Sequence, residues 1–154
     1  MKIKNIIPHL WYDKEAIEAA EYYVSIFPDS KIINIATFDA YNGGTCDVVE
    51  FELSGNPFMA INAGPLFKFN ESVSFMVHCE NQEEIDYYWD KLKDGGEEQA
   101  CGWLKDKFGL SWQIVPSDMN KIMHGDDKEK LSRVIQEVYK MVKFDLEKIS
   151  KASN

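Results

Sequence analysis

One segment decides the fold that this sequence predicts: Cys101-Gly-Trp-Leu-Lys-Asp-Lys-Phe-Gly-Leu-Ser-Trp-Gln-Ile-Val-Pro116. Apolar and polar side chains alternate from Leu110 onward, and this period of two is typical of a strand with two different faces. A charged tight turn is expected before the strand, and Pro116 ends it because proline has no N–H for the ladder. Residues 51–62 repeat the plan of strand, glycine-containing turn and strand, so the sequence predicts two halves of one design.

The rest of the chain falls into two runs of the same order, β-α-β-β-β. In the first run, strands are expected over 2–12, 31–38, 46–53 and 57–63, with a helix over 14–27 that Asp13 would cap. In the second run, strands are expected over 72–80, 97–103, 104–107 and 110–115, with a helix over 82–93 that Asn81 would cap. Residues 117–120 are expected to form a short turn. Helices are then expected from a cap at Asp126 or Asp127 to about residue 141, and over 144–151. The sequence therefore predicts an α+β fold with a first module at 1–66, a second module at 71–116 and a C-terminal helical appendage at 117–154.

Composition limits the classes of partner. The chain has 154 residues with 45% hydrophobic residues, which fits one compact domain or two small modules that share a core. No apolar run is long enough to span a bilayer, and the opening residues do not resemble a signal peptide. The three cysteines form no Cys-x-x-Cys pair, which favours a reducing cytoplasm. The net charge of -9 makes nucleic acid and anionic membranes poor partners.

Several short sequence words resemble one family. They are Pro8-His-Leu-Trp, Glu18-Ala-Ala-Glu-Tyr-Tyr, Phe27-Pro-Asp-Ser, Ala63-Gly-Pro, Gln82-Glu-Glu-Ile-Asp and above all Cys101-Gly-Trp-Leu-Lys-Asp-Lys-Phe-Gly. Together with the repeated order, they resemble the PhnB-like family, often labelled demethylubiquinone methyltransferase-like. That family belongs to the vicinal oxygen chelate superfamily of glyoxalase I, bleomycin-resistance proteins and extradiol dioxygenases. The resemblance covers nearly the whole chain and implies paired βαβββ modules and a homodimer, often with modules paired across chains.

The residues do not support the methyltransferase label. Enzymes that use S-adenosylmethionine usually carry a glycine-rich turn between a strand and a helix. The glycine pairs of this chain, Gly43-Gly44 and Gly95-Gly96, lie instead in turns that precede strands.

The resemblance also indicates where a metal would be held. In metal-dependent members, His and Glu ligands come from the first and last strands of each module. The matching positions are Ile7 or its neighbours, Asn62, Ser74 and Gln113, and none of these is a strong ligand for a transition metal. The sequence therefore predicts no metal and no other cofactor. An alternative set, His9 and His78 with Glu50 or Glu52, would supply two nitrogens and one carboxylate, but we favour hydrogen-bonded histidines that line a polar pocket.

The expected site is a cavity lined by strand residues. The expected cavity faces carry Ile7, His9 and Trp11; Phe58, Ala60 and Asn62; Ser74, Met76 and His78; and Ser111 and Gln113. The predicted ligand-binding residues are His9, Trp11, Asn62, Ser74, His78, Trp103 and Gln113. Trp11 and Trp103 would be aromatic walls, although core packing is the commoner use of tryptophan. The catalytic residues remain unassigned; Glu50 and Glu52 are candidates for a general base, and a solvated sheet edge is the alternative.

Three functions remain open. The first is a metal-independent pocket for a small polar or aromatic molecule. The second is a metal-dependent lyase, isomerase or dioxygenase, and the third is a non-catalytic dimeric interaction module.

Cys79 is expected to be an inert core thiol.

Overall fold

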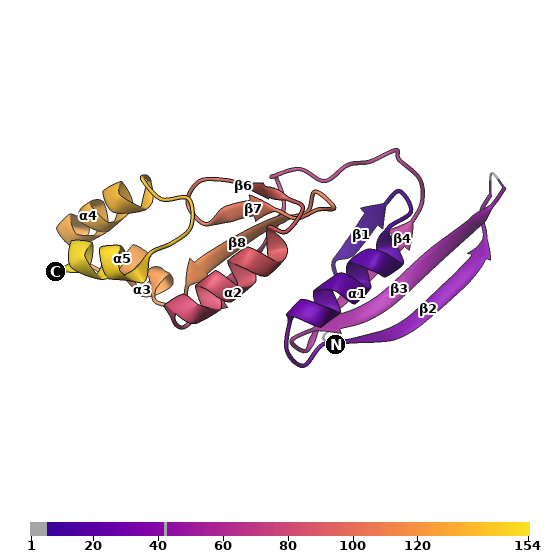
Figure 1. Ribbon diagram of the computed structural model, residues 1–154, viewed down its shortest axis with the longest axis horizontal. Helices are drawn as coiled ribbons and strands as arrows, with labels where there is room; N and C mark the ends of the chain where they lie inside the picture. Colours follow the sequence, from indigo (N-terminus) through magenta and orange to yellow (C-terminus); the bar gives the residue numbers. More distant parts are fainter. Residues whose placement is uncertain (1–5, 42) are drawn as a thin grey trace, which may run out of the picture. The chain divides into compact units, whose positions relative to one another are not determined.

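The computed structural model describes residues 6–41 and 43–154 and has the predicted α+β class (Figure 1). The chain divides between Lys68 and Phe69 into two compact units. Each unit contains a four-stranded mixed sheet with one long helix between its first two strands. None of the helices in the described ranges is long and apolar enough to cross a bilayer.

The first unit follows the predicted β-α-β-β-β order. Its elements are β1 (His9–Tyr12), α1 (Ala16–Ile26), β2 (Lys31–Asp39), β3 (Thr45–Leu53) and β4 (Asn56–Asn62). The strand order in the sheet is β1-β4-β3-β2, with β1 parallel to β4 and the other pairs antiparallel. The prediction of a strand from residue 2 falls partly on residues 1–5, which lie outside the described ranges.

The second unit repeats this order and adds three helices. Its elements are β5 (Ser74–Cys79), α2 (Gln82–Leu92), β6 (Glu97–Glu98), β7 (Trp103–Lys105), β8 (Ser111–Pro116), α3 (Met119–Met123), α4 (Lys128–Val138) and α5 (Leu146–Ser153). The strand order β5-β8-β7-β6 has the same pattern, with β5 parallel to β8. The short turn expected after Pro116 is in fact the helix α3.

The core of the first unit lies between α1 and its sheet. Ala16, Ala19, Ala20 and Tyr23 are fully buried and recur at three- and four-residue spacing on one face of α1. Three of the four are alanines, so the helix can approach closely the buried side chains of β3 and β4. The largest of those are Phe51 and Phe58, whose rings stack with centroids 5.5 Å apart. Burial of a phenylalanine side chain stabilises the fold by roughly 1.5–3 kcal/mol.

The predicted cap of α1 was wrong. The helix begins at Ala16, and neither Asp13 nor the N-cap residue Glu15 caps it with a side chain. Instead, the backbone N–H of Ala16 donates to Oδ1 of Asn62 at 2.7 Å. Parallel pairing places Asn62 beside Tyr12 at the end of β1, so the last residue of β4 lies at the start of the helix.

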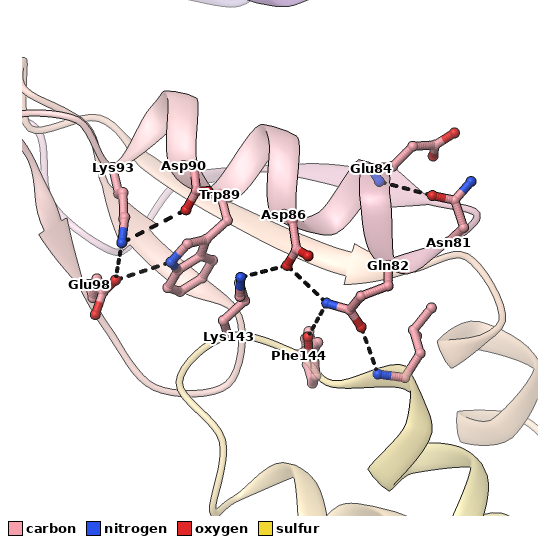
Figure 2. Close-up of polar contacts among 11 residues, drawn as sticks. Asn81, Gln82, Glu84, Asp86, Trp89, Asp90, Lys93, Glu98, Lys143 and Phe144 are labelled. Atoms are coloured by element: carbon pink, nitrogen blue, oxygen red, sulfur yellow. Dashed lines mark hydrogen bonds and ion pairs between the residues drawn. The ribbon is translucent and has the colours of Figure 1, made fainter.

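The core of the second unit is built on α2. Ile85, Trp89 and Leu92 form its buried stripe, and the indole N–H of Trp89 donates to Oε1 of Glu98 at 3.1 Å (Figure 2). The predicted cap is confirmed, because Oδ1 of Asn81 accepts from the backbone N–H of Glu84 at 2.9 Å.

A buried carboxylate organises the hairpin between β7 and β8. Asp106 lies in the charged turn but is only 3% exposed. Its Oδ1 accepts from the backbone N–H groups of Phe108 at 2.9 Å and Leu110 at 3.1 Å, and its Oδ2 accepts from the indole N–H of Trp112 at 2.8 Å. The carboxylate therefore ties the turn to the helix-facing side of β8.

The predicted strand over 97–103 was wrong beyond residue 98. Cys101 and Gly102 adopt left-handed backbone conformations, with φ angles of 59° and 80°, which strands do not contain. These two residues instead form hydrogen bonds with residues 141–142 of the segment 141–146, which is called the C-terminal segment below. Their N–H groups donate to the carbonyls of Met141 at 2.9 Å and Val142 at 2.7 Å. A Cβ atom on Gly102 would lie 2.4 Å from the ring of Phe144, so only glycine permits this approach.

Polar contacts with α2 complete the docking of the C-terminal segment (Figure 2). The side chain of Gln82 donates to the carbonyl of Phe144 at 3.1 Å and accepts from the N–H of Leu146 at 3.0 Å. The ammonium of Lys143 lies 2.5 Å from Oδ1 of Asp86. The last helix begins at Leu146, later than predicted, because the side chain of Asp145 caps it by accepting from Lys148 N at 3.1 Å.

Candidate functional site

Strand pairing shows which side chains of the first sheet lie on the face opposite α1. His9 pairs with Met59 and Trp11 with Ile61 across the parallel strands, and Glu50 pairs with Met59 across the antiparallel pair. Paired residues point to the same side of a sheet, so these five side chains share one face. The buried residues of the neighbouring positions lie on the other face, against α1.

The expected cavity face of β4 was wrong. Val49 pairs with Ala60 and Phe51 with Phe58, so Phe58, Ala60 and the next alternate residue, Asn62, lie on the α1 side. Besides capping α1 with its amide oxygen, Asn62 donates through Nδ2 to Oδ2 of Asp47 at 3.0 Å. Both ends of the amide are therefore engaged inside the first unit.

Trp11 is held by the connector that follows β4. Its indole N–H donates to the carbonyl of Gly64 at 2.8 Å, and its ring meets the edge of Phe67 at a centroid distance of 5.0 Å. The indole is therefore half-buried in an oriented position on the sheet face. Sequence reasoning proposed Trp11 as an aromatic wall but did not identify Phe67 as its partner.

The other predicted residues of this sheet have more open surroundings. His9 and Glu50 are exposed, and Glu52 lies 3.4 Å from the ammonium of Lys31 in an ion pair. Ile7 precedes β1 and is 40% exposed. Neither glutamate lies in a water-excluded setting within this unit, which is the environment that usually favours a carboxylate as general base.

The second sheet brings four of the predicted residues together. Pairing places Ser74 beside Ser111, Met76 beside Gln113 and His78 beside Val115 in the parallel strands, and Trp103 beside Gln113 in the antiparallel pair. The amide Nε2 of Gln113 donates to Oγ of Ser74 at 2.8 Å. An amide, a hydroxyl, a thioether and an indole therefore lie together on the face opposite α2, while His78 is exposed farther along β5.

Ser111 has an unusual environment on the same face. It is fully buried, and its hydroxyl has no hydrogen-bond partner within residues 6–41 and 43–154. A buried hydroxyl without a partner costs about 1–3 kcal/mol. Ser111 was predicted on the cavity face but was not among the predicted ligand-binding residues.

A charged pair borders this face, and sequence reasoning missed it. Lys105 pairs with Ser111 across the strands, and its ammonium lies 2.5 Å from Oε1 of Glu71, which also accepts from the amide of Gln99 at 3.0 Å. The hydrogen bond from Lys105, followed by backbone and Gln99 hydrogen bonds, lowers the pKa of Glu71 to about 2. The two opposite charges cancel, so the border adds little net charge to the face.

The matching positions do not supply the ligands that a transition metal prefers. Asn62 is engaged by α1 and Asp47, while Ser74 and Gln113 bond to each other. All three side chains are neutral, whereas transition metals prefer imidazole, thiolate and carboxylate. Across the described ranges, no three His, Cys, Asp or Glu side chains form a group that could hold a metal ion.

Comparison with known proteins identifies the family. The family model for 3-demethylubiquinone-9 3-methyltransferase matches residues 4–115. A PhnB protein from Bacillus cereus, described as a 3-demethylubiquinone-9 3-methyltransferase, is 32% identical over 73% of this chain and 99% of its own, with a TM-score of 0.66. The chain belongs to this PhnB-like family.

More distant structures share the fold of this PhnB-like protein. Protein PA1353 from Pseudomonas aeruginosa is 16% identical over 74% of this chain and 98% of its own, with a TM-score of 0.62. The fosfomycin resistance protein FosX from Listeria monocytogenes is 13% identical over 81% of this chain and all of its own, with a TM-score of 0.58. These likenesses show that the two proteins share the fold of this chain. No curated protein sequence matches the chain.

Proposed function

We propose that this PhnB-like protein is a cytoplasmic homodimer that binds a small polar or aromatic molecule without a metal. The observation that carries the proposal is the hydrogen bond from Gln113 to Ser74 on the face opposite α2. The family resemblance implies that these residues occupy two of the positions at which metal-dependent relatives hold their ligands, and here they form a neutral hydrogen-bonding pair. Such groups are suited to orienting a polar ligand.

Two neighbouring groups on this face define the class of ligand. The half-buried indole of Trp103 pairs with Gln113 and offers a flat apolar surface to an aromatic ring. The neighbouring pair of Gln113 and Ser74 favours a ligand with a polar atom that approaches the same face. A phenol, quinol or aromatic amide combines both properties. His78, farther along β5, is proposed as an additional ligand-binding residue of the second sheet. His9 and Trp11 are proposed as ligand-binding residues on the face of the first sheet opposite α1.

Binding is a better proposal than methyl transfer, despite the description of the family. The turn from β1 to α1 reads Asp13-Lys14-Glu15, and the turn from β5 to α2 reads Glu80-Asn81. Neither contains the glycines that let a backbone approach S-adenosylmethionine in a doubly wound sheet. The ring of a demethylubiquinone would still suit the indole and amide of the second sheet.

The dimer and the compartment have separate support. Apolar side chains stay exposed along the edge strand β2, where Ile33, Ile35 and Phe38 are 45%, 42% and 50% exposed. An edge strand with an apolar surface is commonly covered by a partner, and a second copy is the partner that family resemblance implies. All three cysteines are free, as expected for a reducing cytoplasm.

The test combines metal analysis with ligand titration. Protein purified without an affinity tag is expected to contain less than stoichiometric zinc, iron and manganese by mass spectrometry. A phenol and quinol panel is expected to raise the thermal midpoint of the protein. Gln113→Ala and Trp103→Ala should remove that shift, while Lys151→Ala on the outer surface of α5 should keep it.

Two results would contradict the proposal. A stoichiometric metal that is lost in His9→Ala or His78→Ala would establish the metal-dependent alternative. A dimer in light scattering whose thermal midpoint responds to no ligand would favour the non-catalytic interaction module.

A further inference from the structure

The C-terminal helices line an open pocket, which lies outside the residues matched by the family. Its volume is about 600 Å³, and it is lined by Pro116 of β8, by α3 and α5, by the loop 125–127 and by Lys130. A cavity of this volume accommodates a small organic molecule. The family match ends at residue 115, so this pocket is built from the part of the chain that the matched family segment lacks.

The walls of the pocket are mainly apolar. Leu146, Ile149, Ser150 and Ser153 of α5 all line it, and their three- and four-residue spacing places them on one face of that helix. Met119 and Ile122 of α3 line it as well. Met119, Ile122 and Leu146 are only half-buried, so apolar surface remains uncovered where packed helices would normally bury it. A ligand with an apolar body would gain free energy by covering this surface.

The charges of the pocket select the head group of the ligand. Three aspartates and two lysines line it, which leaves a net charge of -1. Asp118 and Lys121 cancel in an ion pair at 2.6 Å. Asp127 accepts from the backbone N–H of Lys130 at 2.9 Å and thereby occupies the N-terminus of α4, which would otherwise attract an anion. Asp126 has no hydrogen bond or ion pair to any other residue that the structure describes.

We propose that this pocket binds a small amphiphilic organic cation, with the alkyl or aryl body between α3 and α5 and the ammonium beside Asp126. The apolar stripe of α5 contacts the body, and the carboxylate of Asp126 gains the ion partner that it lacks. An anionic amphiphile of the same size would bring its carboxylate next to Asp126 and Asp127, which opposes binding. This site is separate from the one proposed on the second sheet.

Three matched probes test the proposal on the full chain. Hexylamine, hexanol and hexanoate have the same apolar body and differ in charge, and their dissociation constants can be compared by NMR titration. Hexylamine should bind most tightly and hexanoate most weakly. Asp126→Lys should weaken hexylamine binding by about fivefold to tenfold, because it replaces a favourable charge pair by an unfavourable one. Hexanol should be unaffected.

Control variants locate the binding. Glu21→Lys makes the same charge change on an exposed residue of α1 and should leave hexylamine binding unchanged. Ser150→Trp places an indole in the pocket from an exposed position and should abolish binding of all three probes. Gln113→Ala should leave hexylamine binding unchanged, which separates this pocket from the second-sheet site. Circular dichroism checks that each variant is folded.

Three outcomes would overturn the proposal. The first is that hexylamine does not bind the wild-type chain. The second is that hexanoate binds as tightly as hexylamine. The third is that hexylamine binds Asp126→Lys as tightly as wild type, which would place the ammonium elsewhere even if Ser150→Trp fails to fold.

Discussion

Replacing Asp106 by asparagine tests whether one carboxylate holds the hairpin between β7 and β8. The carboxylate accepts three hydrogen bonds, from the N–H groups of Phe108 and Leu110 and from the indole of Trp112. Asparagine has nearly the same shape but only one accepting oxygen. If that oxygen keeps the backbone bonds, the new NH2 group faces the indole N–H, so two donors oppose each other.

The expected cost follows from these contacts. Hydrogen bonds to a charged group contribute about 1.5–3 kcal/mol, neutral ones about 0.5–1.5 kcal/mol, and a buried donor left without a partner costs about 1–3 kcal/mol. We therefore expect Asp106→Asn to lower the free energy of unfolding by about 2–4 kcal/mol. Trp112→Phe removes the indole N–H, so adding it to Asp106→Asn should cost about 1–2 kcal/mol less than adding it to the wild type.

Equilibrium unfolding in urea measures this double-mutant cycle. The two single variants, the double variant and the wild type are compared at constant m-value, so that a change in midpoint reports stability. Asp94→Asn is the matched control, because it makes the same change in an exposed turn and should stay within about 0.5 kcal/mol of wild type. If Asp106→Asn behaves like this control, or if the two substitutions are additive, the carboxylate does not organise the hairpin as described.

Three further predictions concern single side chains. Asn62→Ala removes the cap of α1 and should lower the free energy of unfolding by about 1–2 kcal/mol in urea, whereas unchanged stability would deny Asn62 this role. Glu71 has its pKa lowered from 4.5 to about 2 by its bond to Lys105, so its stabilising effect is present above pH 4.5 and is lost as the pH falls toward 2. In Glu71→Gln, the midpoint of urea unfolding should change less with pH over that range. If it changes with pH as much as in the wild type, the stabilising role of the Glu71 carboxylate is contradicted. Burial raises the pKa of the Cys79 thiol to about 12, so iodoacetamide at pH 8 should not label it before denaturation, as peptide mass spectrometry would reveal.

Much of the fold was predictable because each signal is local. Period-two alternation gave the strands, spaced alanines gave the buried face of α1, and Asn81 capped α2 as expected. The α+β class and the repeated order followed from these signals together. The cap of α1 was not local, since its acceptor comes from the end of β4, 46 residues away in the chain.

The site was only partly predictable, because alternation divides the side chains of a strand between two faces but does not show which face packs against the helix. On β4 the residues predicted to face the cavity in fact face α1, although the register of the hairpin could have shown this. The two-residue turn at Ser54-Gly55 sets Leu53 opposite Asn56, and counting back along the hairpin sets Phe51 opposite Phe58. On the second sheet, Ser74 and Gln113 could be placed on one face, but Glu71 lies in an irregular connector for which no period predicts a partner.

The contact between Gly102 and Phe144 has a consequence for the order of events during synthesis. The first unit is complete in sequence once Lys68 has been translated, whereas the second unit still lacks the segment that packs on Gly102. At typical rates of translation, the residues from Phe69 to Phe144 take roughly 4–15 s to be added. The first unit is therefore fully synthesised seconds before the segment that packs on Gly102, and the second unit can close only after Phe144 has left the ribosome. A premature stop codon before residue 144 would produce a chain whose second unit lacks the Phe144 ring that packs on Gly102.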